Sequence, residues 1–190
     1  MKFYFIRHGQ TDWNVAKKIQ GKTDIDLNAE GIKQAEKLGD DLLKRDYGIR
    51  TVYTSRLKRA FETAAIIGKK LNVECVILDG VEEVDLGLWE GLSWGEVREK
   101  FPEEFSIWHE RRGETEPPQG ESYMEMLARV LKALKYLKEK NEGDVAVVTH
   151  SAVIMALQSY INETPFENMA QYKAANTSVV MVEGERLRLN

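Results

Sequence analysis

Cysteine is almost absent from this chain, which has a single one, Cys75, among its 190 residues. One cysteine cannot form an internal disulfide, and one thiol is a poor start for a zinc site. The sequence also lacks an acidic cluster of the kind that suggests a bound metal ion. We therefore expect neither a metal nor another cofactor, and we expect Cys75 to be a small, buried or half-buried side chain.

Long apolar runs and a surplus of basic residues are missing too. No uncharged stretch approaches the length of a membrane span, and Arg7 and His8 end the N-terminal apolar run too early for a signal peptide. The net charge of -4 argues against a general nucleic-acid binder, because such proteins usually have a basic surface. The sequence predicts a cytoplasmic protein that binds neither membranes nor nucleic acids, although local arginines could still attract a small anion.

What the sequence does contain is an alternation of buried strands and amphipathic helices. Apolar runs predict strands at residues 3–6, 51–54, 73–78 and 145–148, and a closing hairpin over 177–189. Apolar residues at helical spacing predict helices that begin after Asn28 and after Ser122, one that includes Leu57 and Ile67, and another over 151–161. This alternation favours an α/β layered sheet in a single domain that covers 1–190.

One segment, from about 87 to 120, breaks this alternation and is expected to form a cap-like excursion. Ser93 begins a capping-box pattern for a short helix, and Pro117 and Pro118 end the segment. Three tryptophans fall in or at the edge of it: Trp89, Trp94 and Trp108. Tryptophans are more often packing residues than substrate platforms, although a cap over a cleft could use one of them.

Two of the three histidines follow expected strands directly. His8 and His150 come after the runs at 3–6 and 145–148, and Arg56 and Arg59 follow the run at 51–54. Ligands of open α/β sheets bind beyond the carboxyl ends of the strands. A lone histidine there is more often an ordinary boundary residue, but two with arginines nearby favour a shared site at one sheet edge.

These residue types suit chemistry on a phosphate group. The planar guanidinium of arginine can bind two phosphate oxygens at once. A neutral imidazole has a lone pair that can attack phosphorus, and a carboxylic acid can protonate the departing alcohol. Glu82 and Glu83, after the third expected strand, are both candidates for that acid, and the residues alone do not choose between them.

The segment from Arg7 to Asn14, with the sequence RHGQTDWN, resembles the signature of the histidine phosphatase superfamily, in its phosphoglycerate mutase-like branch. Other segments resemble, in order, the family's second arginine motif, its acid motif, the stretch before its long helix and its second histidine motif: 52–64, 83–91, 118–122 and 147–150. The resemblance covers nearly the whole chain. It implies a three-layer α/β/α sandwich around a mostly parallel central sheet, with a small helical cap.

The resemblance assigns roles to individual residues. It makes His8 the nucleophile that becomes phosphorylated, and it makes Arg7, Arg59 and His150 the groups that bind the transferring phosphoryl group. In the arginine motif the matching position is Arg59, so Arg56 is interpreted as a solvated neighbour near the mouth of the site.

In the acid motif the family's acid stands four residues before the glycine, which selects Glu83 as the general acid and base and leaves Glu82 as an exposed neighbour. The resemblance also implies six residues that bind substrate: Gln10, Thr11, Asn14, Gln20, Gly21 and Ser151.

The expected activity is hydrolysis of a phosphate monoester through a phosphohistidine, on a small phosphorylated metabolite. A phosphoglycerate mutase is the enzymatic alternative, and Arg111 and Arg112 keep it open because they could bind a substrate carboxylate or a second phosphate. A non-catalytic member that binds phosphorylated ligands is the alternative from another class. His109 is expected at the surface or in the cap. The substrate, and whether the protein is a monomer or a homodimer, stay open.

Overall fold

The computed structural model describes residues 1–189 and has a five-stranded sheet at its centre. The strands are β1 (Lys2–Arg7), β2 (Thr51–Thr54), β3 (Glu74–Ile77), β4 (Val145–Thr149) and β5 (Val179–Glu183). Their order across the sheet is β3-β2-β4-β1-β5. Only β5 runs antiparallel to its neighbour, so the sheet is mostly parallel, as expected.

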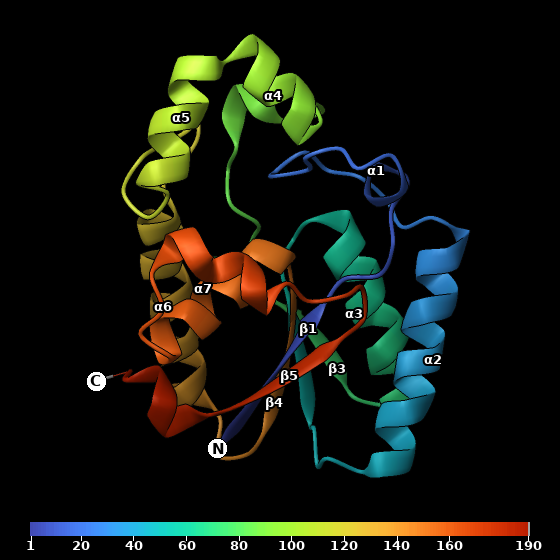
Figure 1. Cartoon of the computed structure of the whole chain (residues 1–190). Coiled ribbons are helices and arrows are strands. Elements are labelled where there is room, and N and C mark those ends of the chain that lie inside the picture. Colours follow the sequence, from blue (N-terminus) through green and yellow to red (C-terminus); the bar gives the residue numbers. More distant parts are fainter. Residues whose placement is uncertain (190) are drawn as a thin grey trace.

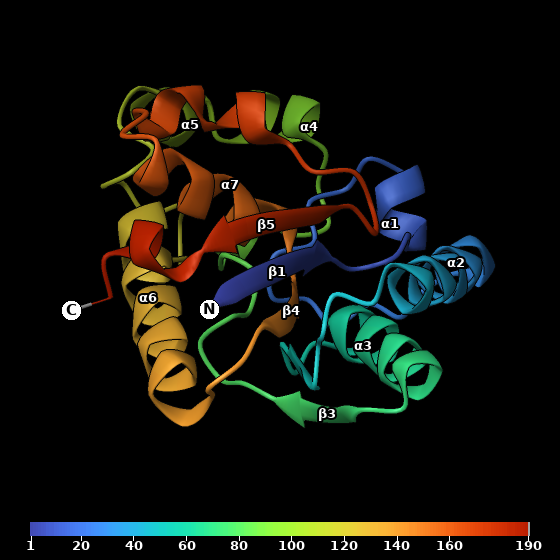
Figure 2. The ribbon, with the colours of Figure 1, turned by 90° about the horizontal axis from the view of Figure 1, so that it is seen from below.

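Helices cover both faces of this sheet, which confirms the three-layer prediction. Helices α2 (Ala29–Arg45) and α3 (Lys58–Leu71) lie on one face, and α6 (Tyr123–Lys140) and α7 (Ser151–Ile161) lie on the other (Figures 1 and 2). The shorter helices are α1 (Asp12–Val15), η1 (Gly87–Trp89), α4 (Trp94–Lys100), α5 (Pro102–Glu110), η2 (Phe166–Tyr172) and η3 (Gly184–Leu187). No helix within residues 1–189 is long and apolar enough to cross a membrane.

The two-sided burial of β1 explains its continuous apolar run. Successive side chains of a strand point to opposite faces. Phe3 and Phe5 join the apolar cluster under α6 and α7, whereas Tyr4 and Ile6 join the cluster under α2 and α3. A strand buried on both faces has no polar face, so it lacks the alternation of a surface strand.

Several helices begin at side chains that cap the first helical turn, as the sequence predicts. Asn28 accepts the backbone N–H of Gly31, and Ser93 and Ser122 each form a full capping box with a glutamate three residues later. Each cap satisfies backbone donors that the first helical turn leaves free. The predicted starts after Asn28, Ser93 and Ser122 are confirmed.

The predicted closing hairpin is wrong in its second half. Residues 179–183 do form β5, but this strand pairs with β1, and residues 184–187 form the short helix η3. The N–H of Gly184 still donates to the carbonyl of Met1 at 2.9 Å, but β1 begins at Lys2, so β5 has no further part of β1 to pair with. Leu187 and Leu189 then fold back into the core beneath the sheet.

The segment from 87 to 120 carries α4 and α5, which stand beyond the sheet beside the long loop that contains α1 (Figure 1). An aromatic cluster holds it together. The ring centroid of Trp108 lies 5.2 Å from that of Trp89 and 5.3 Å from that of Trp94. Trp89 and Trp108 are buried packing residues, whereas Trp94 is 39% exposed and faces the cavity described below.

Candidate active site

The strand register brings the two predicted histidines together. Arg7 at the end of β1 pairs with Thr149 at the end of β4, and Thr54 at the end of β2 pairs with Val148. The residues that follow these strands therefore lie at one sheet edge. The ring centroids of His8 and His150 are 5.3 Å apart, although the two residues are far apart in the sequence.

The hydrogen bond of His8 fixes which ring nitrogen can attack. Nδ1 lies 2.7 Å from the carbonyl oxygen of Gly9, which can only accept, so Nδ1 carries the proton and Nε2 keeps its lone pair. Burial lowers the pKa of His8 well below its ordinary value, and the charges of Arg59 and Arg7 lower it further. His8 is therefore a neutral imidazole with a free nucleophilic nitrogen.

Two arginines are anchored beside His8 by backbone carbonyls. Nη1 of Arg7 donates to the carbonyl of Ala174 at 2.7 Å. Arg59 is fully buried, and its Nη1 and Nη2 donate to the carbonyls of Thr23 and Gly21, each at 2.7 Å. Burial lowers the pKa of Arg59 to about 10, which still leaves the guanidinium charged at neutral pH. These bonds orient the guanidinium groups before any ligand binds.

Glu83 is a carboxyl group suited to carrying a proton. Burial raises its pKa above the ordinary value, against the opposing charges of Arg59 and Arg7. Its two oxygens accept the backbone N–H groups of Val84 at 3.1 Å and Ala152 at 3.3 Å. Arg129 on α6 stabilises the same loop, because its Nη2 donates to the backbone carbonyl of Glu83 at 3.0 Å. The side chain is thus held at the wall of the cavity.

Asn14 is placed by its neighbours so that its amide group faces the cavity. Its Oδ1 accepts the N–H of Thr11 at 3.1 Å and Nδ2 of Asn176 at 3.2 Å. Asn176 also donates to the carbonyl of His8 at 2.9 Å. Both hydrogen bonds of the Asn14 side chain within the described residues use the oxygen, and Nδ2 is left to bind a ligand in the cavity that Asn14 lines.

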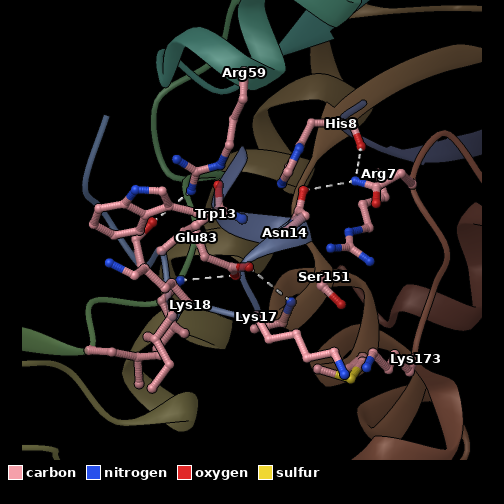
Figure 3. A pocket seen from close by; sticks show the side chains of 18 of the residues that line it. Arg7, His8, Trp13, Asn14, Lys17, Lys18, Arg59, Glu83, Ser151 and Lys173 are labelled. Atoms are coloured by element: carbon pink, nitrogen blue, oxygen red, sulfur yellow. Dashed lines mark hydrogen bonds between the residues drawn. The ribbon is translucent and has the colours of Figure 1, made fainter. Parts of the chain in front are cut away.

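These groups line a cavity of about 560 Å³, which is large enough for a small metabolite rather than phosphate alone. Arg7, His8, Arg59 and Glu83 all contribute to its wall (Figure 3). His150 is completely buried and is not part of the wall; its Nε2 lies 2.9 Å from Oγ of Ser55.

Four of the six predicted substrate-binding residues line the cavity, namely Asn14, Gln20, Gly21 and Ser151. Gln10 and Thr11 do not. Gln10 bonds Gln34 and Asn28 instead, and Thr11 caps α1 and donates to Oε1 of Gln20. We therefore assign Gln10 and Thr11 to shaping the loop rather than to touching substrate.

Other predictions resolve differently. Arg56 is exposed and pairs with Asp79, as expected for a solvated neighbour. Glu82 is not the exposed neighbour that was predicted: its side chain is only 15% exposed, because it accepts the N–H of Gly80 at 2.8 Å and lies 3.6 Å from Arg129. His109 is exposed on α5, as expected.

Arg111 and Arg112 do not line the cavity. Arg111 pairs with Glu114 at 2.6 Å, and the guanidinium carbon of Arg112 lies 4.4 Å from the ring centroid of Trp108. The cationic side chains of the wall other than Arg7 and Arg59 are lysines that the motifs did not indicate: Lys17, Lys18 and Lys173. Lys17 and Lys18 stand just after the first motif, which was a usable signal, whereas no sequence feature marked Lys173.

Comparison with known proteins agrees with this geometry. The sequence matches the family described as the histidine phosphatase superfamily (branch 1) over residues 3–189, and the chain belongs to that family.

Individual relatives span most of the chain. It is 35% identical to a metal-independent phosphoserine phosphatase of Arabidopsis thaliana, over 95% of this chain and 76% of the relative. It is 38% identical to a phosphoglycerate mutase-like protein of the same plant, over 92% of this chain and 75% of the relative. The structure resembles a phosphoserine phosphatase of Entamoeba histolytica in complex with 3-phosphoglyceric acid, with a TM-score of 0.82 and 27% sequence identity. The match covers 95% of this chain and 89% of that protein.

Proposed function

We propose that this protein is a phosphatase that hydrolyses phosphate monoesters of small metabolites through a phosphohistidine on His8. One observation carries the proposal: the bond from Nδ1 of His8 to the Gly9 carbonyl leaves Nε2 unprotonated next to two anchored arginines. The family and the named phosphatases among the relatives support the same reaction.

In the first step, Nε2 of His8 attacks phosphorus in line with the ester oxygen. The N–P bond forms, the P–O bond to the alcohol breaks, and the carboxylic acid of Glu83 gives its proton to the departing alkoxide. The raised pKa of Glu83 supports this role, since it keeps a fraction of the group protonated. Arg7, Arg59 and Nδ2 of Asn14 stabilise the negative charge on the phosphoryl oxygens.

In the second step, the Glu83 carboxylate takes a proton from water, and the hydroxide attacks the phosphorus of the phosphohistidine. The N–P bond breaks, inorganic phosphate leaves, and His8 is again neutral at Nε2. The low pKa of His8 supports this regeneration, because the surroundings disfavour a protonated ring.

A mutase would instead pass the phosphoryl group to a second sugar acid. Arg111 and Arg112 were the sequence features in favour of it, and neither lines the cavity. We therefore favour transfer to water. A mutase assay with and without a bisphosphoglycerate separates the two: isomerisation faster than phosphate release would establish the mutase.

The decisive experiment replaces His8 by alanine and measures phosphate release from glycerol 3-phosphate. We expect a loss of about a thousandfold or more, because no other group can form the intermediate. His109→Ala is the matched control, since it removes an exposed histidine that does not line the cavity. Full activity of the His8 variant would refute the mechanism, and a wild type that hydrolyses no ester in a broad panel would favour a non-catalytic phospho-ligand binder.

The location in the cell and the oligomeric state stay predictions: we propose a cytoplasmic enzyme, and monomer and homodimer are both open.

A further inference from the structure

The cavity holds more positive charge than a phosphoryl group needs. Its wall has five cationic side chains, namely Arg7, Arg59, Lys17, Lys18 and Lys173, and Glu83 is its carboxylate. The two arginines beside His8 match a phosphoryl dianion. The lysines take part in none of the ion pairs found among residues 1–189, so no carboxylate oxygen lies within 4 Å of their ammonium groups.

The backbone of Lys17 allows its side chain to be removed without disturbing the turn. Its φ of 54° lies in the left-handed region, which favours glycine and is costly for a residue with a side chain. The turn is fixed because the N–H of Lys17 donates to the carbonyl of Asn14 at 3.2 Å. Lys17 thus occupies the left-handed turn that directly follows the C-cap of α1, Ala16, where glycine would fit without strain.

Lys173 reaches the cavity from the other end of the chain. It precedes Ala174, whose carbonyl anchors Arg7, so the same short segment holds the phosphate site and supplies this ammonium group. Figure 3 shows Lys17 and Lys173 on the Ser151 side of the cavity and Arg59 on the other side. Lys18 differs, because its Nζ lies 5.6 Å from the ring centroid of Trp13.

We infer that Lys17 and Lys173 form a second anion subsite, which binds an acidic group on the alcohol that leaves. This inference rests on the proposed function and specifies its substrate class: a phosphate monoester whose alcohol carries a carboxylate or a second phosphate. The phosphoryl group lies between Arg7 and Arg59, and the second anion lies toward Ser151. Two separated cationic subsites favour the doubly anionic ester over a neutral one of equal size.

The test compares two pairs of substrates that differ in one charged group. The ratio of kcat/KM for 3-phosphoglycerate to that for glycerol 3-phosphate measures the preference for a carboxylate. The ratio for fructose 1,6-bisphosphate to fructose 6-phosphate measures the preference for a second phosphate. We expect wild type to show a higher kcat/KM for the more anionic member of at least one pair. Lys17→Met and Lys173→Met should each reduce that preference by up to about fivefold, the upper value for one solvent-exposed ion pair.

Lys17→Gly sharpens the test, because glycine suits the left-handed turn and removes only the side chain. It should lose the preference as Lys17→Met does while remaining folded. Lys44→Met, on the exposed face of α2, makes the same charge change far from the cavity and should alter nothing. The subsite would be overturned if the lysine variants lowered kcat/KM equally for both substrates of a pair, or if they lowered kcat/KM for neither pair. Hydrolysis of glycerol 3-phosphate tests the proposed function separately, since it needs no second anion.

Discussion

At the scale of single residues, the site depends on keeping His8 neutral while Glu83 can carry a proton. Burial produces both effects, because it disfavours the charged form of either group. The arginines then act in opposite ways: they help to keep His8 neutral, and they limit the rise in the pKa of Glu83. The nucleophile and the acid can thus coexist in their reactive forms over a shared range of pH.

This arrangement predicts the pH dependence of kcat/KM. Because the first step needs protonated Glu83, the rate should fall as pH rises through its raised pKa. Because the pKa of His8 lies well below 6.5, protonation of the nucleophile should reduce the rate only at pH values well below 6.5. Glu83→Gln should lower kcat/KM on glycerol 3-phosphate by about a hundredfold or more and abolish the fall at high pH.

A second ester provides the control for the Glu83→Gln variant. p-Nitrophenyl phosphate has a leaving group that departs without a proton, so Glu83→Gln should impair its kcat/KM much less. Equal impairment of both esters would show that Glu83 does not protonate the leaving group.

At the scale of elements, one carboxylate joins the loop that holds Arg59 to the loop that begins the cap. Glu90 accepts the backbone N–H groups of Lys22 at 2.8 Å, Thr23 at 2.9 Å and Leu86 at 3.2 Å. It packs so closely on Gly21 that a Cβ there would lie 1.9 Å from its oxygen. The carbonyls that orient Arg59 belong to Gly21 and Thr23, so Glu90 holds Arg59 indirectly.

Glu90→Gln is therefore expected to lower kcat/KM about tenfold or more by misplacing Arg59. A glutamine has one acceptor oxygen, and its NH₂ group would face backbone donors. The loss should largely disappear in an Arg59→Ala background, because Glu90 affects the reaction only through the position of the Arg59 guanidinium. Glu96→Gln, which weakens the capping box of α4, is the matched control and should leave kcat/KM unchanged. Full additivity of the Glu90 and Arg59 changes would contradict the positioning role.

Elements defined by local rules, and residues that directly follow parallel strands, could be predicted from the sequence, whereas the packing of other distant segments could not. The caps at Asn28, Ser93 and Ser122 need only neighbouring residues, and the convergence of His8 and His150 follows from parallel strands. The position of Lys173 depends on how the segment after η2 packs against Arg7, and no local pattern encodes that. The burial of Glu82 likewise depends on Arg129, which comes from a separate helix.

At the scale of the whole molecule, the two buried histidines link stability to pH. Both have pKa values well below 6.5 in the fold, whereas an unfolded chain binds their protons near 6.5. The unfolded state therefore takes up more protons as pH falls below 6.5, and stability should decrease there. We expect a lower Tm at pH 5.5 than at pH 7.5.

His8→Ala should reduce that change in Tm, and His109→Ala, at the surface, should not. Thermal unfolding followed by circular dichroism at the two pH values measures both. An unchanged pH dependence in the His8 variant would show that its titration is not coupled to folding.

The sheet order has a consequence for how the site assembles. Strand β1, which carries His8 at its end, has as its neighbours β4 and β5, and the contact between Lys2 and Asp144 already spans 142 positions. Contacts of such long range form slowly, because a large loop must close before they stabilise anything. During synthesis the nucleophile therefore emerges well before β4 and β5, and its strand cannot pair until they have followed. The phosphate-binding machinery should be one of the last parts of this molecule to become organised.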